Sequence, residues 1–167
     1  MAAVGARAPI YWLIEMALPF NQRVLFPSLT EKNNVVKSTA SPQYNCIAWA
    51  YDIDNRRMWP NNEDYWWPDG VRDDESIDAF VALFKGIGYE GCETNAFEAG
   101  YEKIAIYADV DEPLHAARQL PSGWWTSKLG DGQDIEHAEP GNVEGRRYGR
   151  VAVILKRRLP TAKESAG

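Results

Sequence analysis

The sequence predicts an α+β domain in which N-terminal helices pack on an antiparallel β-sheet. The chain has 167 residues, the size of one ordinary domain, and no linker, repeat or charge block divides it. Apolar residues recur every three or four positions in part of its first half, but from residue 103 onward the period is close to two. We therefore expect a single domain over residues 1–167, with loose termini at 1–9 and 160–167.

Two helices are predicted in the first half of the chain. Turn and capping residues at 38–45 run into residues 46–51, which contain no breaker, so a helix begins at or just before Cys46. Apolar residues at helical spacing over 77–87, preceded by acids, predict a second helix that ends at Gly86 and Gly88. Residues 10–18 fit a strand or a short buried helix equally well, and residues 55–70 predict an irregular aromatic loop.

Short strands are predicted in the second half, and turn residues separate them. The turn at 120–123 predicts a hairpin that places His115 opposite Ser127 or Lys128. No glycine-rich phosphate loop follows any strand, which excludes a doubly wound nucleotide fold. The predicted strands are residues 103–108, 114–119, 124–129 and 149–155.

Composition excludes several classes of function. The 18 basic and 24 acidic residues give a net charge of −6, which disfavours binding to nucleic acid. Two cysteines are too few for a disulfide framework. Neither a signal peptide nor an apolar run of about 18 residues is visible, so we expect no membrane association. A cytoplasmic location is expected, and secretion by a non-classical or effector route stays open.

Cys46 is the candidate nucleophile. At a helix start, unpaired backbone N–H groups and the positive end of the helix dipole favour a thiolate. The alternative is a buried cysteine that acts only as a small apolar residue beside Ile47 and Trp49.

His115 is the candidate general base, because only two histidines are present and this one lies in a predicted strand against which the Cys46 helix can pack. Ser127 or His137 is expected to orient its ring. The alternative is a histidine with a purely structural role in the strand. Together these residues predict attack of a Cys46 thiolate on an amide or ester carbonyl, a thioester intermediate and its hydrolysis assisted by His115.

An oxyanion hole and a substrate cleft complete this hypothesis. The Cys46 backbone N–H supplies one oxyanion donor and the side chain of Gln43 or Asn45 a second, although both amides also suit turn or capping roles. Tryptophans provide candidate walls for a peptide-binding cleft, with loop packing as the alternative. The candidate substrate-binding residues are Trp49, Trp66, Trp67 and Trp124.

Several segments together resemble an uncharacterised group of bacterial domains related to papain-like cysteine hydrolases. They are Tyr44-Asn-Cys-Ile-Ala-Trp-Ala50, Tyr65-Trp-Trp-Pro-Asp-Gly70, Leu114-His-Ala-Ala-Arg-Gln119, Gly123-Trp-Trp-Thr-Ser-Lys-Leu-Gly130, Ile135-Glu-His137 and Tyr148-Gly149. The resemblance covers about Phe26 to Arg158. It implies a papain-like fold, in which the nucleophile opens a helix and the base and orienter lie on successive strands. In papain itself the oxyanion glutamine lies well upstream of the cysteine, whereas Gln43 is only three residues away.

The resemblance further implies a cysteine peptidase or amidase without a cofactor, acting on a peptide or other amide, proteins included. Look-alike domains suggest an effector, toxin or defence setting with a partner protein. A metal site is disfavoured, because Cys46, Cys92, His115 and His137 contain no closely spaced ligand pair. The main alternative is a non-catalytic papain-like binding or immunity module with an aromatic interaction surface.

Overall fold

The computed structural model describes residues 17–166. Most of the predicted strand or helix at 10–18 and the loose terminus at 1–9 therefore lie outside the described residues. Residues 160–166 form turns without helix or strand.

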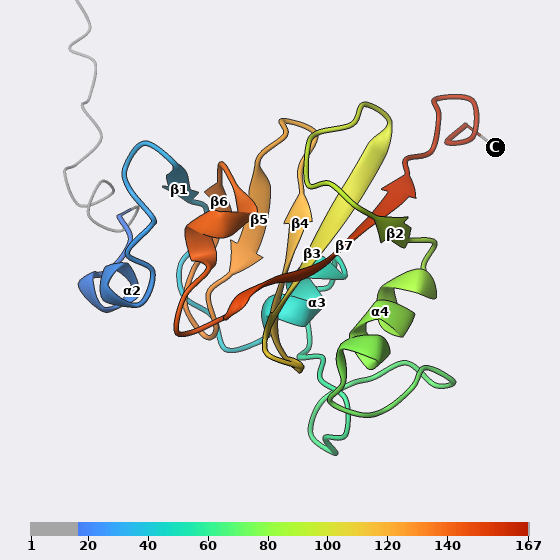
Figure 1. The fold of residues 1–167 in the computed structure, drawn as a ribbon, viewed down its shortest axis with the longest axis horizontal. Coiled ribbons are helices and arrows are strands. Elements are labelled where there is room, and N and C mark those ends of the chain that lie inside the picture. The colour runs from blue at the N-terminus through green and yellow to red at the C-terminus, as the bar shows by residue number, and fades with distance from the viewer. Residues whose placement is uncertain (1–16, 167) are drawn as a thin grey trace, which may run out of the picture.

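A seven-stranded antiparallel sheet forms the centre of the molecule (Figure 1). The strand order is β1-β6-β5-β4-β3-β7-β2, so the two shortest strands form its edges. The strands are β1 (Asn34–Val36), β2 (Glu90–Cys92), β3 (Tyr101–Asp109), β4 (Glu112–Gln119), β5 (Trp125–Lys128), β6 (Asp134–His137) and β7 (Arg150–Arg158). The helices are α2 (Phe20–Leu25), α3 (Cys46–Ala50) and α4 (Ile77–Lys85), with a 3-10 helix, η1 (Pro140–Val143).

The mixed helix and sheet class and the antiparallel sheet agree with the sequence prediction. The helices differ from it, because they are few and short and do not form an N-terminal block: β1 precedes α3 and α4. Strand β1 has only three residues, and all three pair with β6. Because β6 is far away in the sequence, the local pattern around β1 does not predict this strand.

Both predicted helix starts are confirmed. The Asn45 side chain accepts the Ala48 N–H at the start of α3, and the Ser76 side chain accepts the Ala79 N–H at the start of α4. Helix α4 ends at Gly86, as predicted. The side chains that α4 buries are Ala79, Phe80, Leu83 and Phe84.

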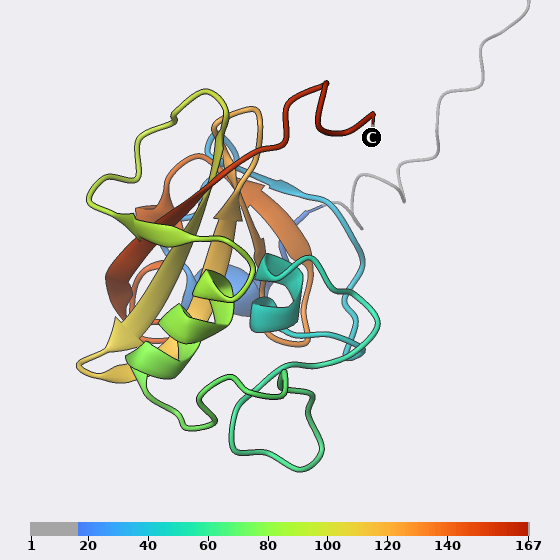
Figure 2. The ribbon, with the colours of Figure 1, turned by 90° about the vertical axis from the view of Figure 1, so that its right-hand side faces the viewer.

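Two hydrophobic cores lie on opposite faces of the sheet. Figure 2 shows α3 and α4 on one face and α2 on the far side of the molecule. The first core joins α3 and α4 to the sheet through Cys46, Ile47, Phe80, Phe84, Ile104 and Ala116, among others. The second core includes Phe26, Tyr107, Ala117, Trp125, Ile135 and Tyr148.

Strands β4 and β5 pair only near their hairpin turn. The ladder consists of Arg118 with Thr126 and Gln119 with Trp125. This register differs by one or two residues from the predicted one, because the turn runs from Leu120 to Trp124, whose backbone groups are hydrogen bonded. Before Arg118, the ladder between β4 and β5 does not continue, so the edge of β4 around Leu114 and Ala116 does not pair with β5. We call this unpaired stretch the opening between β4 and β5, and the candidate site lies there.

Candidate active site

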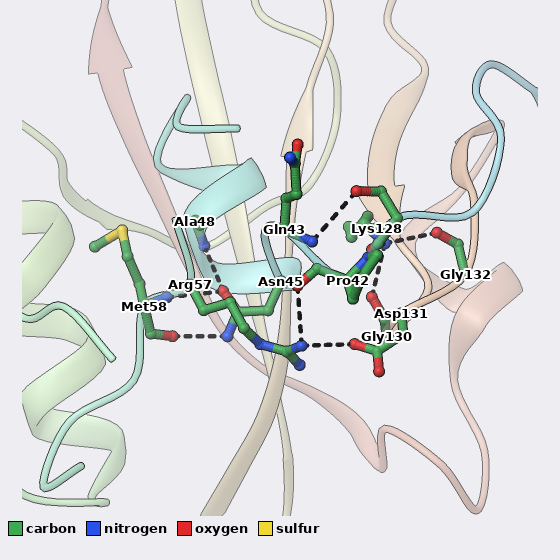
Figure 3. Close-up of polar contacts among 11 residues, drawn as sticks. Pro42, Gln43, Asn45, Ala48, Arg57, Met58, Lys128, Gly130, Asp131 and Gly132 are labelled. Atoms are coloured by element: carbon green, nitrogen blue, oxygen red, sulfur yellow. Dashed lines mark hydrogen bonds and ion pairs between the residues drawn. The ribbon is translucent and has the colours of Figure 1, made fainter. Parts of the chain in front are cut away.

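Asn45 fixes the start of α3 and thereby the position of Cys46. Its side-chain oxygen accepts the N–H groups of Ala48 at 3.2 Å and Met58 at 3.0 Å, and its amide nitrogen donates to the Met58 carbonyl at 2.7 Å (Figure 3). Three hydrogen bonds from one buried side chain tie the helix to the aromatic loop. Asn45 therefore acts as a cap, and these bonds compete with its predicted role as an oxyanion donor.

The Cys46 sulfur lies in the opening between β4 and β5. Its thiol contacts the Leu114 carbonyl at 3.9 Å, and the Ala116 N–H points at the sulfur. These two groups flank His115 in the strand, so the sulfur lies beside the His115 backbone. In this part of the sheet, the thiol occupies the edge of β4 that an adjacent strand would otherwise pair with.

The His115 ring packs in the second core, on the other side of the sheet from α3. It stacks on Tyr148 with ring centroids 3.9 Å apart and meets Tyr107 edge-on at 5.1 Å. In residues 17–166, no hydrogen bond joins the Cys46 sulfur to this ring. The structure thus brings Cys46 to the backbone of His115 and brings the His115 ring to Ser127.

A chain of hydrogen bonds runs from His115 to the backbone of Glu139. The Ser127 hydroxyl lies 3.0 Å from His115 Nε2 and 2.8 Å from His137 Nε2, and His137 Nδ1 lies 2.8 Å from the Glu139 carbonyl oxygen. Both predicted orienting residues therefore belong to one relay. They act in series, with Ser127 between the two rings.

The Glu139 carbonyl sets the direction of this relay, because a carbonyl oxygen only accepts hydrogen bonds. His137 Nδ1 must then carry a proton, which leaves Nε2 of the neutral ring to accept one from Ser127. The Ser127 oxygen in turn accepts the Nε2 proton of His115. Nδ1 of neutral His115 is consequently the nitrogen with a free lone pair, and it is buried without a hydrogen-bond partner.

Burial favours the neutral forms of both the candidate nucleophile and the candidate base. It raises the pKa of the Cys46 thiol to about 11, although the N–H groups of Ala116 and Ile47 act in the opposite direction. The expected lowering by the helix start is thus outweighed. Burial likewise holds the pKa of His115 well below its ordinary value, with the neighbouring His137 as a smaller cause, and lowers that of His137 to about 4.

The remaining predicted residues lie around this centre. Gln43 is exposed, and Figure 3 shows its side chain directed away from Arg57 and Asp131. Trp49 donates to the Thr126 hydroxyl at 2.8 Å, and Trp67 donates to the Arg72 carbonyl at 3.0 Å.

The four tryptophans proposed as substrate-binding residues are all half-buried. Trp49, Trp66 and Trp67 pack against the first core. Trp66 also carries the Arg56 guanidinium over its ring at 3.9 Å. This packing agrees with the alternative structural role and leaves part of each ring accessible.

Sequence reasoning missed two residues of the site. Tyr148, which stacks on His115, follows no periodic pattern because it lies in a loop before β7. The sequence indicates Lys128 only as a position opposite His115, whereas in the structure its side chain is fully buried beside the loop that leads to Cys46. A lysine inside a predicted buried strand was the available signal.

Within residues 17–166, no three His, Cys, Asp or Glu side chains gather in a way that could hold a metal ion. In the same residues, no helix has the length and apolar character needed to cross a bilayer.

The fold and the site together define a mixed helix and sheet domain with a cysteine at a helix start and a histidine relay beside it. A family model described as a domain of unknown function (DUF7689) matches residues 35–156, and the chain belongs to this family. The matched range runs from β1 into β7 and contains Cys46, Ser127 and both histidines. No curated protein and no solved structure matches the chain.

Proposed function

We propose that this domain is a papain-like cysteine hydrolase that attacks an amide or ester carbonyl through Cys46, with His115 as general base and Ser127 and His137 as its orienting relay. One observation carries the proposal: the relay fixes the His115 tautomer in which Nδ1 is an unpartnered base, on a residue whose backbone neighbours contact the Cys46 sulfur.

The proposed reaction begins with a widening of the opening between β4 and β5 that brings the Cys46 thiol to His115 Nδ1. The thiol proton then passes to Nδ1 and the sulfur bonds to the carbonyl carbon. The backbone N–H groups at the start of α3 stabilise the resulting oxyanion, and Gln43 is the candidate side-chain donor. Collapse breaks the bond to the leaving group, which takes the proton from His115. Water, deprotonated by His115, then hydrolyses the thioester and regenerates the thiol.

In this proposal, the neutral Cys46 thiol and the neutral His115 ring represent the resting state of the enzyme. Burial is the largest cause of the raised pKa of Cys46 and of the lowered pKa of His115. An opening that admits water or substrate therefore shifts the two pKa values toward each other and favours the proton transfer. The substrate class in this proposal is a peptide or another amide, and the location is the cytoplasm.

Acylation by an activated ester tests the proposal. In a Cys92→Ser background, 4-nitrophenyl acetate should acetylate Cys46, detected as a mass increase of the intact protein and mapped by peptide analysis. Cys46→Ser should abolish the thioester, and His115→Ala should slow its formation by about a hundredfold. Acetylation that proceeds at an unchanged rate in folded His115→Ala would contradict the assignment of the base.

A non-catalytic binding module is the second candidate, because Cys46 and His115 are both buried in the described structure. Absence of acylation in a folded protein, with ligand binding that persists after Cys46→Ser, would favour this candidate.

A further inference from the structure

Lys128 is a buried charged group that the proposed mechanism does not use. It lies in β5, directly after Ser127, and its side chain is fully buried. Its ammonium group donates to three backbone carbonyls: Ser41 at 2.7 Å, Gly130 at 2.8 Å and Gly132 at 2.6 Å (Figure 3). An ammonium group has three protons, so each one has a partner.

The three carbonyls come from two separate loops. Ser41 belongs to the segment that leads into α3, whereas Gly130 and Gly132 belong to the turn between β5 and β6. A second bridge runs in parallel, since the Arg57 guanidinium donates to the Pro42 carbonyl at 3.1 Å and pairs with Asp131 at 2.9 Å. Lys128 therefore links the backbone before the nucleophile to the strand that carries Ser127.

The positive charge of Lys128 also acts on the Cys46 sulfur. It lowers the pKa of the thiol, against the larger effect of burial, and the sulfur in turn favours the charged lysine. Burial lowers the pKa of Lys128, while Asp134 and Asp131 raise it and Arg57 lowers it. The Tyr44 ring faces the ammonium group at 5.0 Å.

We propose that Lys128 is the positioning residue of Cys46: its ammonium group holds the loop before the nucleophile against the loop after Ser127, and its charge stabilises the Cys46 thiolate when it forms. The inference rests on the proposed function in taking Cys46 as the reactive thiol. Three carbonyls accept hydrogen bonds from this cation, and among residues 17–166 no carboxylate forms an ion pair with its ammonium group that would cancel its charge.

The test compares Lys128→Gln with Lys128→Arg in the Cys92→Ser background, where Cys46 is the only thiol. Both replacements can donate hydrogen bonds to the carbonyls, but only arginine keeps the charge. The rate of alkylation of Cys46 by iodoacetamide is measured against pH over the range in which circular dichroism shows a folded protein. At a fixed pH at which the Lys128 ammonium group is still charged, Lys128→Gln should slow alkylation about tenfold, because loss of this charge raises the pKa of Cys46 by about one unit. Lys128→Arg should leave the pKa close to that of the parent.

Lys103→Gln is the matched control. Lys103 is another buried lysine, and its ammonium group donates to the Thr94 carbonyl at 2.8 Å in a different part of the sheet. It should leave the Cys46 profile unchanged. A purely structural role for Lys128 would loosen the site and speed alkylation without moving the apparent pKa. Equal profiles for Lys128→Gln and Lys128→Arg, or an equal shift in Lys103→Gln, would overturn the proposal.

A second measurement applies if a Lys128 variant does not fold. The nitrogen-15 resonance of the Lys128 ammonium group in the parent protein should show a titration step at the pKa of Cys46, and this step should disappear in Cys46→Ser. A parent protein without such a step would also overturn the proposal. Failure of the ester to acylate Cys46 counts against the hydrolase alone, because both measurements report on the thiol without a substrate.

Discussion

The protonation of single residues decides what the candidate site can do. Burial lowers the pKa of His137 to about 4, although the hydrogen bond from its ring to the Glu139 carbonyl acts in the opposite direction, and Ser127 lies at the other ring nitrogen. A charged ring would have to donate from both nitrogens, and the Ser127 hydroxyl would then have to reverse its direction. The same relay that orients His115 thus resists protonation.

This resistance predicts a loss of stability in mild acid. The folded-state pKa of His137, about 4, lies below the unfolded value of about 6.5, so the unfolded chain binds the proton first. The contribution of His137 is therefore complete above pH 6.5 and is lost as the pH falls toward 4. It amounts to roughly 3 kcal/mol, and His115 acts in the same direction. Urea unfolding at a series of pH values measures it.

His137→Gln is the control for this titration. It removes the titrating group and should flatten the dependence of the free energy of unfolding on pH between 6.5 and 4. If the parent and His137→Gln lose the same free energy over this interval, the buried histidine is not its source.

The two cysteines should differ in reactivity, in the order opposite to the one that the helix start suggests. Cys46 is buried, with a pKa raised to about 11, whereas Cys92 is half-buried at the end of β2. Relative to an ordinary thiol, such a pKa lowers the thiolate fraction at pH 8 by about two orders of magnitude. Iodoacetamide should therefore label Cys92 first in the folded protein. Peptide mapping after timed quenching would reveal the reverse order if Cys46 is already a thiolate.

At the scale of single elements, the short helix α3 depends on its cap. Five residues are too few for a helix that is stable in isolation, and α3 gains its position from the three hydrogen bonds of Asn45 and from packing on β4 and β5. The Asn45 cap also made the start of α3 predictable, because a capping residue is a local signal in the sequence. The length of α3 was not predictable, because packing determines where the helix ends.

Replacement of the two helix caps should have unequal effects. Ser76→Ala removes one capping bond of α4 and should cost about 1 kcal/mol of folding free energy. Asn45→Ala removes three bonds from a buried side chain and leaves backbone groups of Met58 unpaired, so its cost should be about 2–3 kcal/mol. Denaturant unfolding of both variants measures the difference, and an equal cost would mean that the Met58 contacts contribute nothing.

The strands show what local sequence can and cannot predict. The periods of two in β3, β4 and β7 were sufficient to locate them, because each is long enough to alternate. The four-residue strand β5 also lies within a predicted strand, 124–129, which turn residues bound on both sides. Strands β1, β2 and β6 have three or four residues and are defined by their partners.

Strand β4 also contains an irregularity that decides the site. Tyr107 pairs with His115 but Ala108 pairs with Pro113, so Leu114 is an extra residue. One extra residue reverses the face of the side chains that follow it. The sequence therefore predicted His115 in a strand next to the Cys46 helix, but the face toward which its ring points could not be predicted.

At the scale of the whole molecule, the two candidate residues belong to different cores. Cys46 is part of the core under α3 and α4, and the His115 ring lies in the core that Phe26 and Tyr148 close. They meet only through the opening between β4 and β5. Any event that widens or exposes this opening acts on both residues at once, so the proposed coupling between Cys46 and His115 runs through the sheet itself.

The second core is covered by the least firmly held helix that the structure describes. None of the six residues of α2 is buried, and Phe20 and Val24 expose 74% and 61% of their surface. Helix α2 contributes few apolar contacts, whereas β3 lies between β4 and β7 with long ladders on both sides. Local opening should therefore begin at α2 and reach β3 last. Amide hydrogen exchange followed by mass spectrometry should show α2 exchanging first, α3 and α4 later, and the centre of β3 only on global unfolding. Exchange of α3 before α2 would instead place the first opening on the Cys46 side of the sheet.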